Sequence, residues 1–196
     1  RGDLGDTAAL AALVEGADAV IHVAGLTNTP DPATFEAANV TGTANVIAAM
    51  KLAGARRLVF VSSLSARMPG LSAYGASKAK AEALVEASGL DWTTVRPPGV
   101  YGPRDVDYLE MFRTAKWGFV PLPPGGASSI IHADDLAALL VALAASNAAP
   151  TKKKVYEPDD GREGGWSHKE LAAAIGRAVG RARVFAPHLP RAVLDA

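Results

Sequence analysis

A tyrosine and a lysine four residues apart, Tyr74 and Lys78, are the side chains of this sequence best suited to proton chemistry. They open an expected helix at residues 73–87, where a spacing of four places both side chains on one face. A phenol with an ordinary pKa of ~10 is a weak base at neutral pH, but a neighbouring ammonium favours the phenolate and lowers that pKa. Because such pairs are common on helix surfaces, their surroundings decide whether they do chemistry.

Serine hydroxyls precede this helix in the chain. An apolar strand expected at residues 58–61 ends at Val61, and Ser62 and Ser63 follow it directly. Ser63 lies 11 residues before Tyr74. Since ligands of open α/β sheets bind at the carboxyl ends of the strands, we expect the serine, the tyrosine and the lysine to meet there.

Strands and helices alternate around this group. Short apolar runs predict buried strands, and 3.6-residue spacing with caps predicts helices. The expected order is helix 7–14, strand 19–24, helix 35–53, strand 58–61, helix 73–87 and strand 93–95. After a Pro-Pro-Gly break we expect helix 107–116, strand 129–132, helix 135–145, strand 155–156 and a helix from 168 to about 179, capped by Ser167 with Glu170. This alternation predicts an α/β fold with a doubly wound parallel sheet.

The composition excludes several classes of function. A chain of 196 residues, 49% of them apolar, predicts one main domain and a small additional region. Lys+Arg and Asp+Glu both number 20, so we expect small-molecule partners rather than nucleic acid or a membrane. With no cysteine and no histidines at ligand spacing, we expect no metal site and a cytoplasmic location. No apolar run approaches the ~20 residues of a membrane span.

Around Ser63, Tyr74 and Lys78 the sequence resembles the short-chain dehydrogenase/reductase superfamily, in which Ser, Tyr and Lys form the catalytic group. The resemblance covers most of the chain and is strongest to the extended and atypical branches, the NAD-dependent epimerase/dehydratase type. Five further segments match in order: residues 2–4, 16–25, 39–45, 96–103 and 131–137. The resemblance implies a Rossmann-like fold, an NAD or NADP cofactor, a partial NAD(P)-binding domain at 1–105 and a substrate-side region at 106–196.

The resemblance also implies a role for each residue of the group. Tyr74 exchanges a proton with the substrate oxygen while hydride passes to or from nicotinamide, and Ser63 orients that oxygen. Lys78 binds the nicotinamide ribose and lowers the pKa of Tyr74. Asn39 supports them, although it could equally cap or kink its helix. The expected cofactor contacts are Asp3, Leu4, Val23, Ala24, Gly25, Val61, Ser62, Tyr74, Lys78, Pro97, Pro98 and Val100. The expected substrate contacts are Ser63, Ser65, Tyr101 and Arg104, and either Ser62 or Ser65 replaces Ser63 if the loop aligns differently.

Two features depart from the family pattern. The sequence has no strand, glycine-rich turn and helix to hold a pyrophosphate. Because strand 19–24 would then have an exposed apolar edge, we expect residues upstream of Arg1, and we expect the chain to end inside a helix that starts at about 190. Nucleotide-sugar members carry an arginine where Ser128 and Ser129 stand, which weakens a sugar-nucleotide substrate unless Arg104 supplies the charge.

Other polar residues have structural interpretations. We expect His22 to be a hydrogen-bonded core histidine, Asp134 and Asp135 to cap the helix that follows them, and the three lysines at 152–154 to be solvated. The resemblance further implies a homodimer that pairs through helices 35–53 and 73–87.

We therefore expect an NAD(P)-dependent oxidoreductase or epimerase/dehydratase that acts on a secondary alcohol, a ketone or a sugar derivative. The alternative is a non-catalytic NAD(P)-binding scaffold or redox-sensing subunit of the same superfamily. The presence of all three residues of the group favours the enzyme, because a scaffold has no physical need for them. The substrate, the stereochemistry and the choice between NAD and NADP are not encoded in these residues.

Overall fold

Residues 57–61 form a fully buried strand inside a parallel sheet. The structure is a computed structural model that describes residues 1–123, 125–146 and 148–188. In the order β1-β2-β3-β7, the main sheet contains β1 (Ala19–His22), β2 (Arg57–Val61), β3 (Asp91–Val95) and β7 (Lys154–Tyr156), and every neighbouring pair is parallel. A strand in the middle of a parallel sheet is covered on both faces, which explains the unbroken apolar run of β2.

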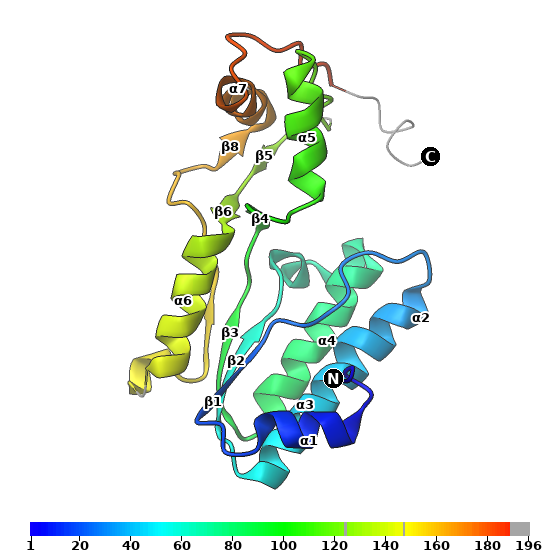
Figure 1. The fold of residues 1–196 in the computed structure, drawn as a ribbon, viewed down its shortest axis with the longest axis vertical. Coiled ribbons are helices and arrows are strands. Elements are labelled where there is room, and N and C mark those ends of the chain that lie inside the picture. The colour runs from blue at the N-terminus through cyan, green and yellow to red at the C-terminus, as the bar shows by residue number, and fades with distance from the viewer. Residues whose placement is uncertain (124, 147, 189–196) are drawn as a thin grey trace. The chain divides into compact units, whose positions relative to one another are not determined.

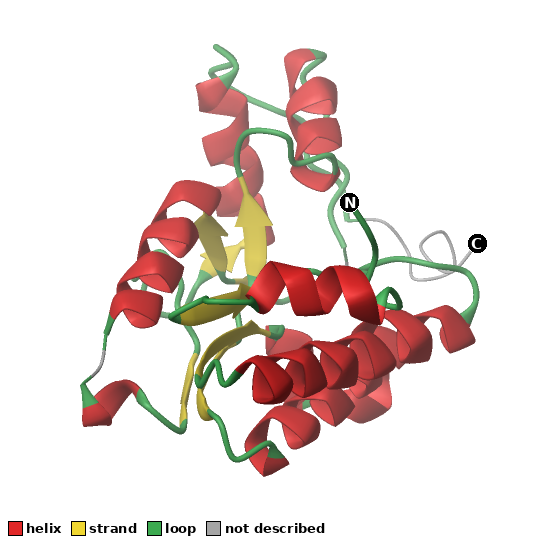
Figure 2. Cartoon of the chain, turned by 60° about the horizontal axis from the view of Figure 1, so that its bottom comes forward, coloured by secondary structure: helices red, strands yellow, loops and turns green. Residues whose placement is uncertain are grey.

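Helices cover both faces of this sheet. They are α1 (Thr7–Val14), α2 (Pro32–Phe35), α3 (Gly42–Ala53), α4 (Ala73–Ala87) and α6 (Ala133–Ala145). Figure 1 shows α1, α3 and α4 on one side of the strands and α6 on the other, and Figure 2 shows the stacked helices from a second direction. Met50, Leu58, Phe60 and Val85 are buried between the strands and the first group of helices. The expected α/β class with a parallel sheet is confirmed.

The chain divides into two compact units. Unit 1 contains Arg1–Pro97 and Asp135–Pro158, and unit 2 contains Pro98–Asp134 and Asp159–Ala196. These units do not coincide with the expected ranges 1–105 and 106–196. The difference arises because β7 returns to pair with β3, which joins residues 135–158 to the first unit.

Unit 2 has its own small core. Its elements are β4 (Gly99–Tyr101), α5 (Asp107–Lys116), β5 (Ala127–Ser128), β6 (Ile130–His132), β8 (Trp166–Ser167) and α7 (His168–Ala178). Strands β4 and β6 pair in parallel, and β5 and β8 pair antiparallel. The α7 helix begins with the expected capping box, in which Ser167 Oγ accepts from Glu170 N and the Glu170 carboxylate accepts from Ser167 N.

Several expected elements differ in detail. The strand expected at 19–24 ends at His22, and the helix expected at 35–53 is interrupted by a π-helical segment, Glu36–Thr41. The two aspartates expected to cap α6 lie inside its first turn, and His132 takes that place, since its Nδ1 accepts from Asp134 N at 3.2 Å. Of the lysines at 152–154, Lys152 is not simply solvated but pairs with Asp91 at 3.0 Å. The helix expected at residues 190–196 lies outside the described residues.

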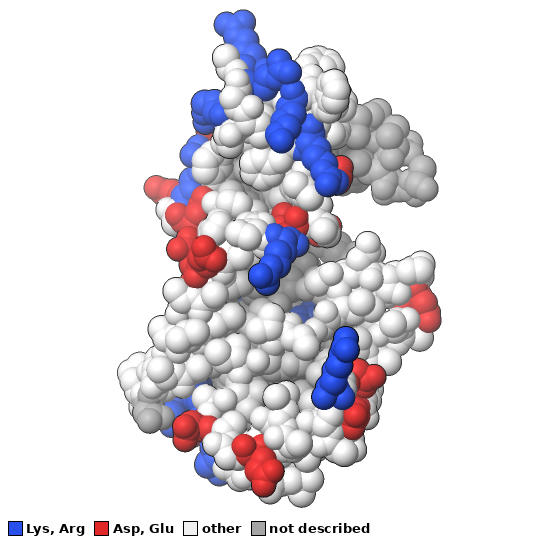
Figure 3. Space-filling model, in the orientation of Figure 1, with Lys and Arg blue, Asp and Glu red and all other residues white. Residues whose placement is uncertain are grey.

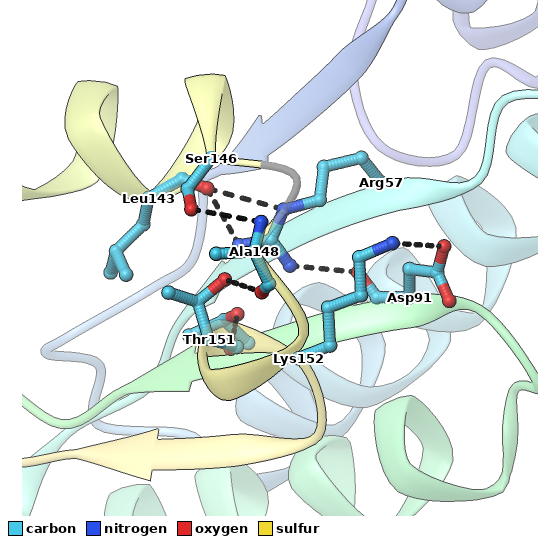
Figure 4. Close-up of polar contacts among 8 residues, drawn as sticks. Arg57, Asp91, Leu143, Ser146, Ala148, Thr151 and Lys152 are labelled. Carbon is cyan, nitrogen blue, oxygen red and sulfur yellow. Dashed lines mark hydrogen bonds and ion pairs between the residues drawn. The ribbon is translucent and has the colours of Figure 1, made fainter.

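A buried arginine joins β2 to the end of α6 (Figure 4). Arg57 donates through Nε and Nη2 to the Leu143 carbonyl oxygen at 3.2 and 2.6 Å, and through Nη1 to the Asp91 carbonyl oxygen at 2.9 Å. The last carbonyls of a helix are unpaired and carry partial negative charge. The guanidinium therefore stabilises the end of α6 and fixes it to the sheet. Among the helices of the described residues, none is both long enough and apolar enough to cross a bilayer.

Candidate active site

Lys78 is buried where β2 ends. It lies in the second turn of α4, whose start is fixed by the Ser72 hydroxyl accepting from Gly75 N at 3.0 Å. The residue is only 4% exposed, and its Nζ donates to the Val61 carbonyl oxygen at 2.8 Å. Burial lowers the pKa of Lys78 to about 8, and the carboxylate of Glu82 acts in the opposite direction. Burying an ammonium away from water costs folding free energy. A buried charged group with a shifted pKa is typical of functional sites.

Tyr74 lies one helical turn before Lys78 and is partly buried beside Phe35, with 5.9 Å between the two ring centres. Burial raises the pKa of the Tyr74 phenol, and a side-chain hydrogen bond with Ser63 acts in the opposite direction. The net direction is opposite to the expected lowering, and a contribution of Lys78 to this pKa stays a prediction. The ammonium is directed to the Val61 carbonyl, and the loss of hydration around the phenol dominates. Tyr74 is protonated at neutral pH and can act as a proton donor.

The structure distinguishes the three candidate serines. Ser63 is the one whose side chain interacts with Tyr74, and its Oγ also accepts from Ser65 N at 3.2 Å. Ser62 is buried, and its backbone N–H donates to the Val95 carbonyl oxygen at 2.7 Å. Ser65 is exposed. These positions favour Ser63 over the other two as the partner of Tyr74.

Asn39 is a buried residue of the π-helical segment, and its side chain makes hydrogen bonds to two other parts of the chain. Its Oδ1 accepts from Leu26 N at 2.7 Å, and its Nδ2 donates to the Leu26 carbonyl oxygen and to Ser77 Oγ, both at 2.9 Å. Ser77 Oγ in turn donates to the Tyr74 carbonyl oxygen at 2.7 Å. Asn39 thus ties the loop after β1 to the helix that carries Tyr74. A direct contact of Asn39 with reacting groups stays a prediction.

His22 is a buried histidine with a hydrogen-bond partner, as expected. Its Nε2 lies 3.0 Å from Thr43 Oγ1, and that hydroxyl donates to the Asn39 carbonyl oxygen at 2.6 Å. Because the Thr43 proton is directed to Asn39, we assign the ring proton to Nε2, which donates to Thr43. Burial, with a smaller contribution from Lys78, lowers the pKa of His22 to about 4, so the ring is neutral at neutral pH.

The surroundings of Lys78 fit the nicotinamide half of a dinucleotide. A Cβ at Gly25 would lie 2.9 Å from Asn39 Oδ1 and 3.7 Å from Lys78 Nζ, so only a bare backbone can pass there. The Ser62 hydroxyl is buried and has no hydrogen-bond partner among the described residues. The ends of β1 and β2 thus present the Gly25 backbone, the Ser62 hydroxyl and the Lys78 ammonium. These groups can hydrogen-bond the polar groups of a ribose or a carboxamide.

Three other residues of unit 1 that were expected to contact the cofactor make hydrogen bonds that fix turns and loops. The Asp3 carboxylate accepts from Gly5 N and Asp6 N at 2.7 and 3.1 Å and so fixes the turn before α1. The Leu4 carbonyl accepts from Asn45 Nδ2 at 2.9 Å, and the Pro97 carbonyl accepts from Leu64 N at 3.0 Å. Val23 and Ala24 are exposed after β1. Their contacts with a cofactor stay predictions.

The remaining expected site residues, Pro98, Val100, Tyr101 and Arg104, belong to unit 2. The Tyr101 ring lies edge-on to His132, with 5.2 Å between ring centres. Arg104 has a φ of 73°, in a turn closed by Asp105 N donating to the Gly102 carbonyl oxygen at 3.1 Å. A left-handed arginine is strained, because this turn position favours glycine. The roles of these residues toward cofactor or substrate also stay predictions.

Sequence reasoning missed the polar residues that support the group. Ser77 connects Asn39 to the Tyr74 backbone, and Glu82 pairs with Arg96 through two hydrogen bonds of 2.9 and 2.5 Å. Glu82 is buried and follows Lys78 by one helical turn. The spacing from Lys78 to Glu82 was visible in the sequence, and it was the one signal that could have identified this carboxylate.

A family model described as NAD(P)H-binding matches residues 1–147. The chain belongs to this family. Membership of an NAD(P)H-binding family agrees with the resemblance drawn from Tyr74, Lys78 and the matched segments, and the folds of NAD-dependent epimerases and dehydratases are similar to this one. The expected cofactor class, NAD or NADP, is likewise confirmed.

The chain is 37% identical over 182 residues to ceramide reductase from Caulobacter vibrioides, covering 91% of the chain and 56% of that protein. It is 32% identical to 2-alkyl-3-oxoalkanoate reductase from Stenotrophomonas maltophilia, covering 94% of the chain and 63% of that protein. The chain therefore spans little more than half the length of these curated relatives. Among solved structures, UDP-glucuronic acid 4-epimerase from Bacillus cereus, in complex with UDP-glucuronic acid and NAD, matches with a TM-score of 0.82 at 18% identity, over 96% of this chain and 67% of that one. That likeness confirms the Rossmann-like fold.

Proposed function

We propose that this chain carries the catalytic group of an NAD(P)-dependent oxidoreductase that interconverts a ketone and a secondary alcohol, with Tyr74 as the proton donor. One observation carries the proposal: a buried lysine and a half-buried tyrosine lie one turn apart on α4. The Ser63 side chain also acts on the pKa of that phenol. Packing alone does not explain a lysine that is 4% exposed. The two curated relatives described above are both named as reductases, which supports the direction of ketone reduction.

Tyr74, Ser63 and Lys78 each have a different role in the proposed reaction. Tyr74 Oη donates its proton to the carbonyl oxygen of the substrate, and Ser63 Oγ holds that oxygen by a hydrogen bond. The Lys78 ammonium has three N–H donors, of which one binds the Val61 carbonyl, and the others would bind the hydroxyls of the nicotinamide ribose. The cofactor, when bound, supplies the hydride that reaches the carbonyl carbon.

The protonation states fit the direction of reduction. A phenol is protonated at neutral pH, and burial raises the pKa of Tyr74 further, so the proton needed by the developing alkoxide is in place before the reaction. After the proton leaves, the phenolate lies one turn from the positive charge of Lys78, which stabilises it. Solvent then returns a proton to Tyr74 Oη.

The test is a Tyr74→Phe variant of the complete gene product, with any residues that flank this chain, assayed on ketones with NADH and with NADPH. We expect kcat to fall by about 10²–10⁴-fold, the usual contribution of a positioned proton donor, while cofactor binding measured by fluorescence persists. Tyr156→Phe is the matched control, because it removes a phenol that makes a long hydrogen bond, at 3.5 Å, to the Pro150 carbonyl.

Unchanged turnover in Tyr74→Phe removes Tyr74 from the mechanism. If the wild type binds NADH or NADPH but converts no ketone or secondary alcohol, the non-catalytic scaffold becomes the better proposal. Lys78→Met adds a second readout, since it should weaken cofactor binding in either case.

A further inference from the structure

Unit 2 contains two neighbouring cavities with volumes of about 220 and 200 Å³. Tyr108 of α5 and Leu171 of α7 line both cavities and form their shared wall. Both side chains belong to the apolar cluster of unit 2. Each cavity is large enough to hold part of a small molecule, although each is smaller than a typical site for a drug-sized ligand.

The side chains that line the two cavities indicate which kind of ligand they can bind. The smaller cavity is lined only by aromatic and aliphatic side chains, among them Phe112, Trp166 and Ile175. The larger adds Ser128, His168 and the carboxylate of Asp107 to a mainly apolar lining. No lysine or arginine lines either cavity in the described part of the chain, although Lys and Arg side chains gather on the surface of unit 2 in Figure 3.

These linings disfavour a diphosphate. A phosphate group loses its hydration on entering a cavity and needs a cation or several N–H donors in return. Here it would meet a mainly apolar lining, the negative charge of Asp107 and no more than single donors from Ser128 and His168. A hydrocarbon chain has no such requirement and gains free energy from every methylene that it buries.

The walls are held in place by contacts outside the cavities. Trp166 Nε1 donates to Asp160 Oδ2 at 2.6 Å, and the guanidinium of Arg162 lies 4.2 Å from the centre of its ring. Arg162 is itself bound to Glu170 at 2.6 Å. On the other side, a Cβ at Gly99 would overlap the Tyr108 hydroxyl, so this glycine makes room for the shared wall. A site whose walls are already fixed loses little conformational entropy on binding.

We propose that these two cavities bind a hydrocarbon chain and exclude nucleoside diphosphates. The site goes beyond the proposed function, because it rests on the lining of unit 2 and does not require Tyr74 or a cofactor. It assigns to this chain an aliphatic ligand in place of the sugar nucleotides found in its structural neighbours.

The test is isothermal titration of the complete gene product, without cofactor, with 2-hexanone, 2-octanone and 2-decanone. Each added methylene should tighten binding about fourfold, or about fifteenfold for each step of the series, with a negative heat-capacity change. Uridine diphosphate should neither bind at the same site nor displace 2-decanone. Affinity that does not change with chain length, or displacement by uridine diphosphate, would overturn the proposal.

A variant locates the site. Ala174 lines the smaller cavity, so Ala174→Phe should fill it and weaken 2-decanone binding by about fifteenfold or more, the worth of at least two methylenes. Ala137→Phe, on an exposed position of α6, is the matched control and should bind as the wild type does. Equal affinity in both variants would place the ligand elsewhere and contradict the proposal.

The ketone series on the wild type decides the question even if Ala174→Phe fails to fold. Because these titrations need no turnover, the two proposals fail separately. A chain-length effect in a protein that converts no ketone keeps this site and removes the proposed activity.

Discussion

The buried ammonium of Lys78 should give the stability of this protein a specific dependence on pH. Its pKa is about 8 in the folded chain, below the ordinary lysine value of 10.5. Between these two values the unfolded chain keeps the proton and the folded chain releases it, so the unfolded state binds more protons and stability rises with pH. Below pH 8 both states are protonated, and the contribution of this group is level.

The size of the effect follows from the difference between the two pKa values. One pKa unit corresponds to ~1.4 kcal/mol, so the free energy of unfolding should rise by about 3 kcal/mol across the interval. Lys78→Met carries no titrating group there and should lack this rise. The loss of the hydrogen bond to the Val61 carbonyl changes the stability of the variant by the same amount at every pH, so it does not obscure the slope.

The assay is urea unfolding of the complete gene product, without cofactor, below pH 8 and near pH 10.5, comparing wild type with Lys78→Met. Other tyrosines and lysines titrate in both proteins, so only the difference between the two curves matters. Lys80→Met is the matched control on the same helix, since Lys80 is 60% exposed and pairs with Glu36 at the surface.

Parallel curves for wild type and Lys78→Met would refute the reasoning. They would mean that the ammonium is hydrated in the folded protein, and the central observation behind the proposed function would then fail with it. A difference that falls as the pH rises would show the opposite sign, namely that folding favours the charged lysine.

Two further substitutions test the supports of the site. Arg57→Met removes three hydrogen bonds to the carbonyls of Leu143 and Asp91 and should lower the free energy of unfolding by about 3 kcal/mol in urea, with Arg57→Lys recovering part of the loss. Asn39→Ala releases both polar groups of Leu26 and should lower stability by about 2 kcal/mol. It should also weaken NADH or NADPH binding in a fluorescence titration, whereas unchanged binding would limit Asn39 to a structural role.

The parts of the fold that were predictable have strong local signals. Helices α1, α4, α5 and α7 begin and end within a residue of their expected limits, because caps such as Ser167 are visible in the sequence. The π-helical segment was not predictable, because residues 35–53 have helical spacing throughout. The contacts of Asn39 with Leu26 and Ser77, residues distant in sequence, accompany the irregular turn in the structure.

Some features of the candidate site were likewise predictable from the sequence, and others depend on tertiary contacts. The positions of Tyr74 and Lys78 on one helix face follow from their spacing, but the direction of the Tyr74 pKa depends on burial, which spacing does not reveal. The serine that interacts with Tyr74 depends on the path of the loop after β2, and that path is fixed by the Val95 and Pro97 carbonyls. Sequence patterns therefore indicated the candidate chemistry, and tertiary contacts determine the direction of the Tyr74 pKa and which serine acts on it.

The polar contacts of unit 1 suggest why the buried charge is tolerated. Glu82 lies one turn after Lys78 and raises its pKa, while Arg96 holds the Glu82 carboxylate in place by two hydrogen bonds. Glu82 thus interacts with both Arg96 and Lys78. Its negative charge offsets part of the free energy that it costs to remove the Lys78 ammonium from water. Because Arg96 begins the Arg-Pro-Pro-Gly segment after β3, the same ion pair connects that segment to the helix that carries Tyr74 and Lys78.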